Sequence, residues 1–303
     1  PQCRSRIDKI ADRLGNMRLY HVALFCSPLT DTRKGSTREM ECVIMFREDY
    51  LTICENGRKK LDFFRSRPFG YFLSAMLAGM FIALGSFAAM CIGGFATAAG
   101  STAVKFLVSL VFAAALSLVI AAGCELFTGN NLVLGAASLN RTVSWRDTAL
   151  LWFVCYVGNL LGSWVLILIF QATGITGNEA VASFFVTTAQ SKVSQDALAL
   201  FTRGILCNIC VCLAVWCSVR LKDEAARLIM VVWCILIFMI CGFEHSIANM
   251  TIIGTALLNT TQDVTLSGYV WNLVFVTLGN MVGGTVFVAL PYHLVAQEGQ
   301  KVG

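Results

Sequence analysis

The sequence CGFEHSIANM, residues 241–250, decides how the rest of this chain is interpreted. It places Glu244 and His245 side by side in the middle of a long apolar segment. An ionisable side chain at membrane depth is costly, so by default it marks a functional site. We interpret the stretch as an interruption in a transmembrane helix. The alternative is a buried histidine that is only hydrogen-bonded, because unusual titratable groups also serve structure.

The composition identifies an integral membrane protein. The 303 residues are 57% hydrophobic and only 14% charged, whereas soluble domains carry about 25% charged residues. Continuous apolar runs of about 20 residues predict spanning helices rather than the alternating strands of a barrel. The net charge of +5 does not indicate a nucleic-acid partner, because the basic residues lie at the ends of apolar runs, where they set orientation.

Six apolar segments are expected to cross the bilayer, and the second and fifth are interrupted near residues 125–130 and 244–245. The segments are 69–94, 106–140, 148–173, 204–219, 228–259 and 268–296. Lysine and arginine are concentrated before the first segment and in the loops that follow the second and fourth. This bias places both termini in the cytoplasm of a multi-pass protein of the cytoplasmic membrane.

The chain divides into four regions by pattern. Residues 1–44 are expected to be an extension of unknown role. Residues 45–67 read as an amphipathic helix along the inner membrane face, because Phe46, Tyr50 and Cys54 recur at helical spacing between charged residues. Residues 68–296 form the six-helix transmembrane domain. Residues 297–303 are a cytoplasmic tail.

The two halves of the transmembrane domain repeat one pattern. LFTGN at residues 126–130 and FEHS at 243–246 are each followed by a G-N-x-x-G segment, at 158–162 and 279–283. Three spans per half force the halves into opposite orientations, so we expect a 3+3 inverted repeat. Paired interrupted helices in such a repeat indicate a binding site near the membrane midplane.

The interruptions also carry a physical expectation about charge. Thr128 and Ser246 are placed to cap the half-helices that follow them. The positive ends of those half-helices would then favour an anion near the midplane. The glycines of the two G-N-x-x-G segments are spaced for close helix packing, which is the main role expected for them. They are Gly158, Gly162, Gly279, Gly283 and Gly284.

Cysteine usage gives no sign of a metal or cofactor. The chain has 13 cysteines, mostly inside apolar segments, where they act as small apolar residues. Cys207 and Cys210 have C-x-x-C spacing, but no second pair completes a zinc site. We therefore expect no metal, cofactor or disulfide framework, and no enzyme activity.

From Met45 to Pro291, these motifs together resemble the formate/nitrite transporter family. The run Glu-His-Ser-Ile-Ala-Asn-Met at 244–250 is similar to the bacterial formate and nitrite branches. The resemblance implies an aquaporin-like fold with helices 2 and 5 broken, assembled as a homopentamer with one pore per protomer. Residues 1–44 have no counterpart in the family pattern.

The resemblance also implies roles for individual residues. The substrate pathway would contain the central histidine, its threonine partner, two asparagines and a vestibule lysine: His245, Thr128, Asn208, Asn280 and Lys192. Apolar constrictions would be formed by Phe112, Leu116, Leu126, Phe127, Val211 and Phe238. Glu244, Gly129 and Ser246 would be structural residues at the helix breaks.

The resemblance implies passage of nitrite or formate, the anions of weak acids. An unpaired ion crosses a dry constriction only at high cost. A protonated His245 would offer the anion a charge and a donor, or it would pass its proton on so that the neutral acid crosses. The ordinary histidine pKa of about 6.5 suits either mode. Thr128 would orient the imidazole, and Lys192 would attract anions.

Several alternatives stay open at this point. Hydrosulfide and short carboxylates such as lactate or acetate fit the same family. A water or glycerol pore would need paired Asn-Pro-Ala motifs, which the sequence lacks. A membrane redox protein is the alternative from another class, although one intramembrane histidine is too few for a two-histidine haem site.

Overall fold

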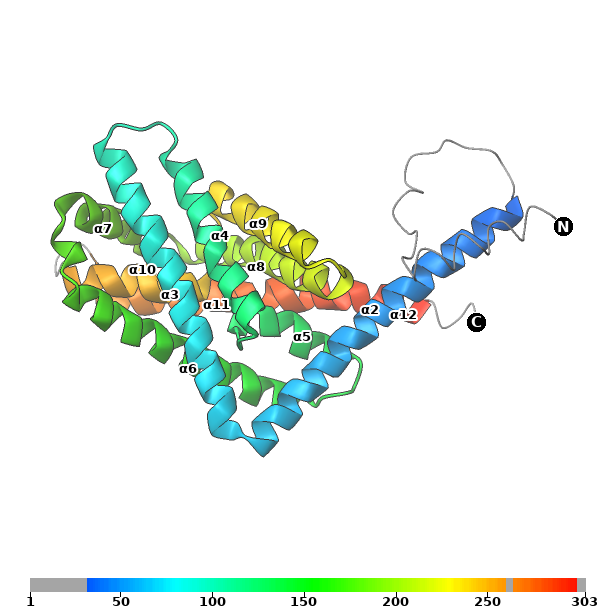
Figure 1. Cartoon of the computed structure of the whole chain (residues 1–303). Helices are drawn as coiled ribbons and strands as arrows, with labels where there is room; N and C mark the ends of the chain where they lie inside the picture. Colours follow the sequence, from blue (N-terminus) through cyan, green and yellow to red (C-terminus); the bar gives the residue numbers. More distant parts are fainter. Residues whose placement is uncertain (1–31, 260–263, 299–303) are drawn as a thin grey trace, which may run out of the picture. The chain divides into compact units, whose positions relative to one another are not determined.

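The computed structural model describes residues 32–259 and 264–298, with side chains from Phe46 onward. The chain splits into two units, residues 1–41 and 42–303, and the account below concerns the second. Residues 1–31 of the expected extension lie outside what is described, whereas residues 32–44 are helical, so the boundary expected at residues 44–45 falls inside a helix. The fold class is all-helical, and we keep the helix labels of Figure 1.

Six helices in the described part of the chain are long and apolar enough to cross a membrane, as the sequence predicts. The spans and the shorter helices around them are α2 (Thr32–Ser66), α3 (Pro68–Ala98), α4 (Val104–Ala122), α5 (Phe127–Leu139), α6 (Trp145–Ala172), α7 (Glu179–Val193), α8 (Ala197–Arg220), α9 (Glu224–Cys241), α10 (Ser246–Asn259), α11 (Leu266–Gly284) and α12 (Leu290–Glu298). A 3-10 turn, η1 (Ile175–Gly177), precedes α7, and a π-helical turn, η2 (Thr285–Ala289), joins α11 to α12.

Where the second and fifth segments were expected to be interrupted, the chain forms two helices instead of one. α4 ends at Gly123 (φ 71°) and α9 ends at Gly242 (φ 73°), both in the left-handed region. Glycine adopts this conformation without steric cost, so each glycine ends its helix and turns the chain. α5 and α10 then begin only a few residues later.

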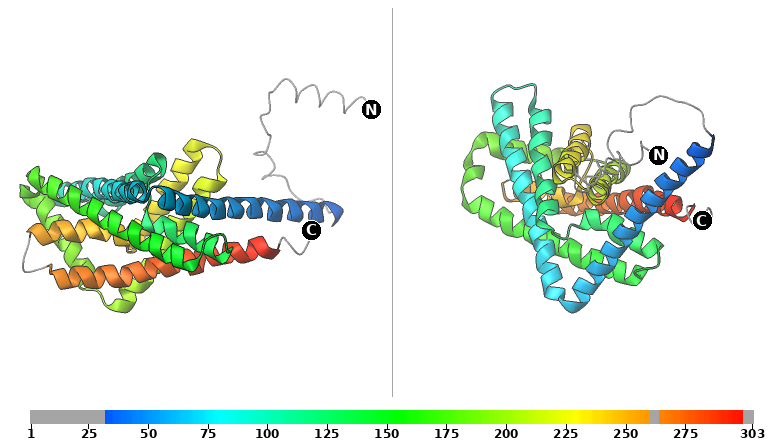
Figure 2. Two further views of the ribbon diagram at one scale, coloured as in Figure 1. Left: turned by 90° about the horizontal axis from the view of Figure 1, so that it is seen from below. Right: turned by 45° about the vertical axis from the view of Figure 1, so that its right-hand side comes forward.

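Helix pairs pack through small residues. Figures 1 and 2 show α3 beside α4, and α8 beside α9. α6 crosses α3, and α11 crosses α8, at the glycines of the G-N-x-x-G segments. A Cβ added at Gly158 would lie 2.6 Å from the Ala75 Cβ, and one at Gly162 would overlap the Met76 carbonyl oxygen. The expectation that these glycines permit close packing is confirmed.

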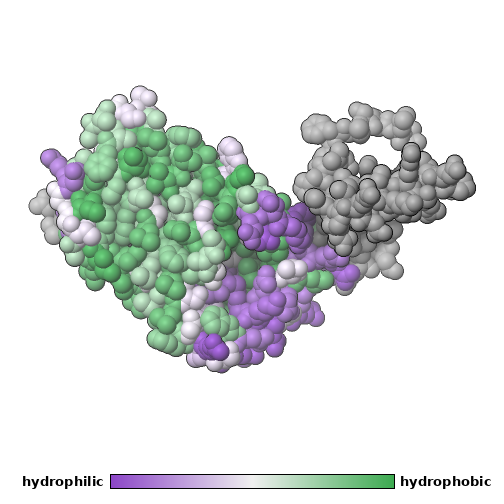
Figure 3. All heavy atoms as spheres, viewed as in Figure 1, coloured by the Kyte–Doolittle hydropathy of each residue, from purple (hydrophilic) through white to green (hydrophobic). Residues whose placement is uncertain are grey.

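The surface matches a membrane setting. Large apolar side chains such as Phe153, Leu198 and Phe69 are two-thirds exposed or more. In Figure 3 hydrophobic residues cover the face over α3 and α4, while hydrophilic residues gather over α2 and the α5–α6 loop. Such a broad apolar surface is typical of a protein that meets lipid or other subunits.

Candidate functional site

His245 lies between α9 and α10 and touches the other interruption directly. The residue is 4% exposed, and its Nε2 is 3.1 Å from the Thr128 Oγ1 on α5. The Phe238 ring stacks on the imidazole at 6.0 Å between centroids. The hydrogen bond that we expected between Thr128 and His245 is therefore present. It joins two segments that are 117 residues apart in sequence.

The hydrogen bonds of His245 define its protonation in this arrangement. The backbone N–H of Ala248 donates to the imidazole Nδ1 at 3.1 Å. A nitrogen that accepts an N–H carries no proton itself, so the ring is the neutral tautomer with its proton on Nε2. The Nε2–H then donates to the Thr128 hydroxyl oxygen. Protonating Nδ1 would set two N–H groups against each other, so a charged ring must give up this position.

The interruptions are held by asparagines, which corrects our expectation for Thr128 and Ser246. The Asn159 Oδ1 accepts the Phe127 N–H at 2.9 Å, and the Asn280 Oδ1 accepts the Ser246 N–H at 3.0 Å. The Thr128 hydroxyl is engaged by His245. The Ser246 hydroxyl has no hydrogen-bond partner among the described residues. One backbone donor at each half-helix start is therefore satisfied from α6 or α11, and the His245 Nδ1 caps α10 locally by accepting the Ala248 N–H.

Neither asparagine expected to hold substrate offers a free N–H. The Asn280 Nδ2 donates to the carbonyl oxygens of Gly204 (2.8 Å) and Glu244 (3.0 Å). The Asn208 Nδ2 lies 2.6 to 3.2 Å from three protein oxygens. Only the Asn208 Oδ1 is unpaired, and an oxygen acceptor repels an anion. Both side chains are fully buried and bonded to the protein, and the substrate role expected for Asn208 and Asn280 stays a prediction.

Lys192 is not a free vestibule cation. Its ammonium group lies 2.8 Å from the Glu244 carboxylate, and the Lys192 side chain is 15% exposed. The same carboxylate accepts the Asn249 Nδ2 at 2.6 Å. Glu244 thus links α7 to α10 directly beside His245. Removing one member of such a buried pair typically costs about 3–5 kcal/mol, because the other charge is left uncompensated.

A matching set lies at the first interruption, and the sequence reasoning missed it. Lys60 of α2 lies 2.7 Å from the Glu125 carboxylate, which accepts the Asn130 Nδ2 at 2.9 Å. The missed signal is a glutamate followed by an asparagine five positions later, present at both interruptions. Glu125 is also an ionisable residue within an apolar segment. Lys60 is 65 residues before it, so no local pattern connects the pair.

The expected constriction residues are all buried, and four of them lie in two groups. Phe112 and Phe238 meet edge to face at 6.1 Å, which places Phe112, Phe238 and His245 in a row. Leu116, Leu126 and Gly129 line a cavity of about 390 Å³ that also contains Lys60. The two remaining residues lie apart: the Phe127 ring packs on Tyr156 at 5.0 Å, and Val211 is buried on α8.

Comparison with known proteins shows which family has this architecture. A family profile described as "Formate/nitrite transporter" matches residues 47–294. The chain belongs to the formate/nitrite transporter family. A relative from Bacillus subtilis, "Uncharacterized transporter YwcJ", is 39% identical across 78% of this chain and 92% of its own length. "Nitrite transporter NirC" of Escherichia coli is 33% identical across 85% of this chain and 95% of its own length.

Solved structures of the formate/nitrite transporter family have the same fold. One described as "FNT family ion channel" covers 81% of this chain and 97% of its own, with 30% identity and a TM-score of 0.75. Another, "Pentameric formate channel with formate bound", covers 76% and 97%, with 28% identity and a TM-score of 0.65. The chain is accordingly a multi-pass membrane transporter and not an enzyme.

Proposed function

We propose that this chain passes small monovalent anions of weak acids, nitrite or formate, across the cytoplasmic membrane through a pore controlled by His245. The observation that carries the proposal is the buried hydrogen bond between His245 and Thr128, which joins the two helix interruptions. The names of the relatives support the substrate class, because one is a nitrite transporter and one solved neighbour holds formate.

The pore is built from two inverted halves in this proposal, with the second and fifth transmembrane helices broken. Matching contacts support the repeat. Asn159 bonds the carbonyl oxygens of Ala75 and Glu125, as Asn280 bonds those of Gly204 and Glu244. Each glutamate in turn pairs with a lysine and an asparagine. In this correspondence Leu126 occupies the place of His245, so only one half carries an imidazole.

The route runs from the cavity beside Lys60, past Leu116 and Leu126, to His245 and then past Phe112 and Phe238. Lysines beside both interruptions attract the anion toward the apolar ring. Each lysine is paired with a glutamate. Its positive charge therefore acts on the anion only when the ion pair separates or when the glutamate charge is screened. The Nε2–H of His245 is the donor nearest to the narrow part, and it turns from Thr128 to the anion.

The position of the His245 ring supports proton coupling. A protonated imidazole has to leave the Ala248 N–H, so protonation and movement of His245 are linked. The charged ring then either accompanies the anion as a counter-charge or gives up its proton, after which the neutral acid crosses and the ring returns. Both modes couple the flux to pH, because each requires the ring to gain and lose a proton.

Assembly and orientation are part of the proposal. We expect a homopentamer in the lipid bilayer with one pore per protomer, supported by the similarity to a pentameric formate channel. Residues 45–67 are expected to lie along the inner membrane face, with both termini cytoplasmic. In native mass spectrometry of the detergent-solubilised protein, we expect a mass of five chains. A dominant monomer or dimer would contradict this assembly.

A side-by-side flux assay tests the substrate. We expect proteoliposomes to take up nitrite and formate faster than lactate and hydrosulfide across a range of pH. Faster uptake of lactate or hydrosulfide would assign the chain to another substrate of the same family. Equal uptake by empty liposomes would remove the transport proposal altogether.

A further inference from the structure

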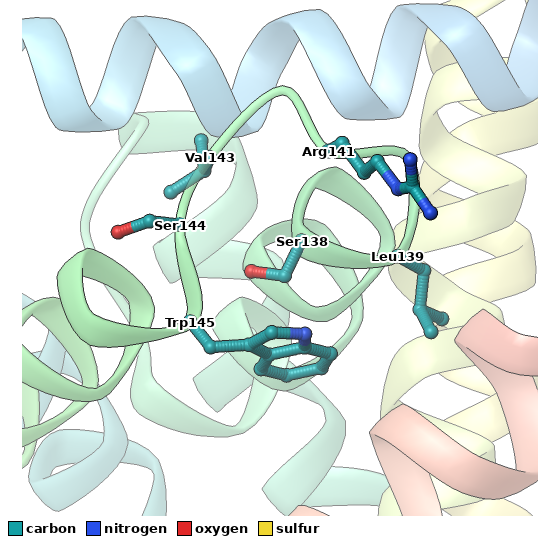
Figure 4. A pocket seen from close by; sticks show the side chains of 6 residues that line it. All are labelled: Ser138, Leu139, Arg141, Val143, Ser144 and Trp145. Carbon is teal, nitrogen blue, oxygen red and sulfur yellow. The ribbon is translucent and has the colours of Figure 1, made fainter.

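A second hollow lies outside the anion route, where α5 turns into α6. Its volume is about 490 Å³, and its lining combines a cation, two hydroxyls and apolar groups: Ser138, Leu139, Arg141, Val143, Ser144 and Trp145. Figure 4 shows Arg141 and Leu139 on one side of the hollow, Ser144 and Val143 on the other, and the Trp145 indole below Ser138. It shares no residue with the cavity beside Lys60.

The backbone at Arg141 is unusual for an arginine. Arg141 has φ 60° and is the only non-glycine residue with positive φ in the described part of the chain. Its N–H donates to the Ser138 carbonyl, and the Thr142 N–H donates to the Ala137 carbonyl. This is the Schellman arrangement at the end of a helix, in which the left-handed position normally holds glycine. An arginine there is disfavoured by the backbone, so the side chain has to be explained.

The charge of Arg141 also has no ionic partner among the described residues. Its side chain is exposed. The nearest acidic residue of the following helix, Asp147, is already held by Arg65 at 3.1 Å and by Ser144 at 2.7 Å. The hollow therefore presents one free guanidinium and no free carboxylate in its lining.

The location of the hollow favours a lipid as its ligand. It lies at the end of two transmembrane elements, beside the hydrophilic surface formed over α2 and the α5–α6 loop. Trp145 is 49% exposed there, and tryptophan is typical of the membrane–water boundary. A guanidinium recognises phosphate oxygens with two parallel hydrogen bonds. Leu139 and Trp145 supply the apolar contact that the glycerol and acyl carbons of a lipid need.

We propose that this hollow binds the phosphate group of an anionic phospholipid, with Arg141 as the recognition residue and Trp145 as the apolar floor. The site depends on the membrane setting of the chain and not on the identity of the transported anion. A failure of the anion-transport proposal would leave it standing, and its own failure would leave the transport proposal standing.

The backbone makes a sharp test available. Arg141→Gly removes the guanidinium but suits the left-handed conformation, so the variant should melt at the same or a higher temperature than wild type. Arg141→Asn is a second variant that removes the charge and tolerates this conformation. Arg146→Gln is the matched control, because it removes one exposed positive charge from the same loop region without touching the hollow.

The measurement is retention of phosphatidylglycerol against phosphatidylcholine, counted by native mass spectrometry of protein released from nanodiscs. We expect wild type and Arg146→Gln to retain phosphatidylglycerol preferentially, and Arg141→Gly and Arg141→Asn to lose about tenfold of that preference. An unchanged preference in both Arg141 variants would overturn the proposal. Displacement of the lipid by millimolar inorganic phosphate, with phosphate bound in its place, would overturn it in favour of a free-phosphate site.

Discussion

At the scale of the residue, two asparagines that lie on other helices bond the backbone N–H groups at the starts of α5 and α10. Asn159 and Asn280 each use the side-chain oxygen to accept an N–H at a half-helix start. Each uses its amide hydrogens for two backbone carbonyls. Irregular backbone at membrane depth is tolerated only when its polar groups are satisfied inside the protein. These side chains are what allow the interruptions to exist.

Asn280→Ala should therefore destabilise the protein more than it alters substrate preference. The change leaves the Ser246 N–H and the Glu244 carbonyl without their Asn280 partner, at about 1–3 kcal/mol for each buried group, and removes one hydrogen bond to the Gly204 carbonyl. We expect a large drop in the melting temperature of the detergent-solubilised protein. Asn56→Ala is the control, because Asn56 makes no side-chain hydrogen bond to the described residues. A variant that melts like wild type yet loses anion affinity would instead support a ligand role for Asn280.

Cys54 gives a prediction for alkaline pH. The thiol lies on α2, is 1% exposed, and donates to the Ala136 carbonyl. Burial raises the pKa of Cys54 to about 11. The stability that the buried, protonated Cys54 thiol contributes to the fold is therefore complete below the ordinary thiol pKa and is lost as the pH rises toward 11. The melting temperature of wild type should fall over this range more steeply than that of Cys54→Ala. Parallel curves for wild type and Cys54→Ala would contradict the prediction, with Cys241→Ala as the control.

Some of the site could be predicted from single residues and some could not. His245 is visible because an imidazole within an apolar run is costly unless it is used. The hydrogen bonds of the Asn208 and Asn280 side chains could not be predicted. The sequence shows which groups can form hydrogen bonds, but only the fold shows which partners lie beside them. The Lys60–Glu125 pair depends on the path of α2, which passes close to Glu125 only in the folded chain.

At the scale of the element, close crossings of helices fix the positions of the interruptions. A Cβ at Gly283 would overlap the Ile205 carbonyl oxygen, as one at Gly162 would overlap that of Met76. The Asn159 and Asn280 side chains reach their carbonyl partners because the backbones approach this closely. In both helix pairs, α3 with α6 and α8 with α11, the close packing at the glycines is therefore also what allows the asparagine to bond the carbonyl groups.

Gly162→Ala and Gly283→Ala should each separate one of these helix pairs. The methyl group meets backbone, which cannot move away as a flexible side chain would, so we expect a marked loss of thermal stability. Gly177→Ala is the matched control, because no atom lies within 4 Å of the Cβ it would add. Equal melting temperatures for all three variants would show that the crossings are looser than described.

The elements could be predicted where hydrophobicity dominates. All six membrane-capable helices fall on expected apolar segments, and the turns at Gly123 and Gly242 fall just before the expected interruptions. α7 (Glu179–Val193) was missed, because threonine, serine, glutamine and lysine break its apolar pattern. Its burial depends on α3 and α10, which pack against it in the fold. That contact is what brings Lys192 to Glu244.

At the scale of the whole molecule, the two halves are similar in scaffold and different at one position. Both carry a glutamate held by a lysine and an asparagine, and both are fastened by an asparagine from a G-N-x-x-G segment. Only one half carries a titratable ring, where the other has Leu126. The proton coupling that we propose therefore rests on His245, a residue that only one half carries.

The pH dependence of uptake by His245→Asn is the most direct test of this account. Wild-type proteoliposomes loaded with formate or nitrite should change their flux with pH, because the proposed modes require His245 to gain and lose a proton. His245→Asn should assemble normally and show a flux that is nearly independent of pH, because asparagine hydrogen-bonds but carries no exchangeable charge. A variant that assembles and keeps the wild-type pH profile would contradict the central role given to His245.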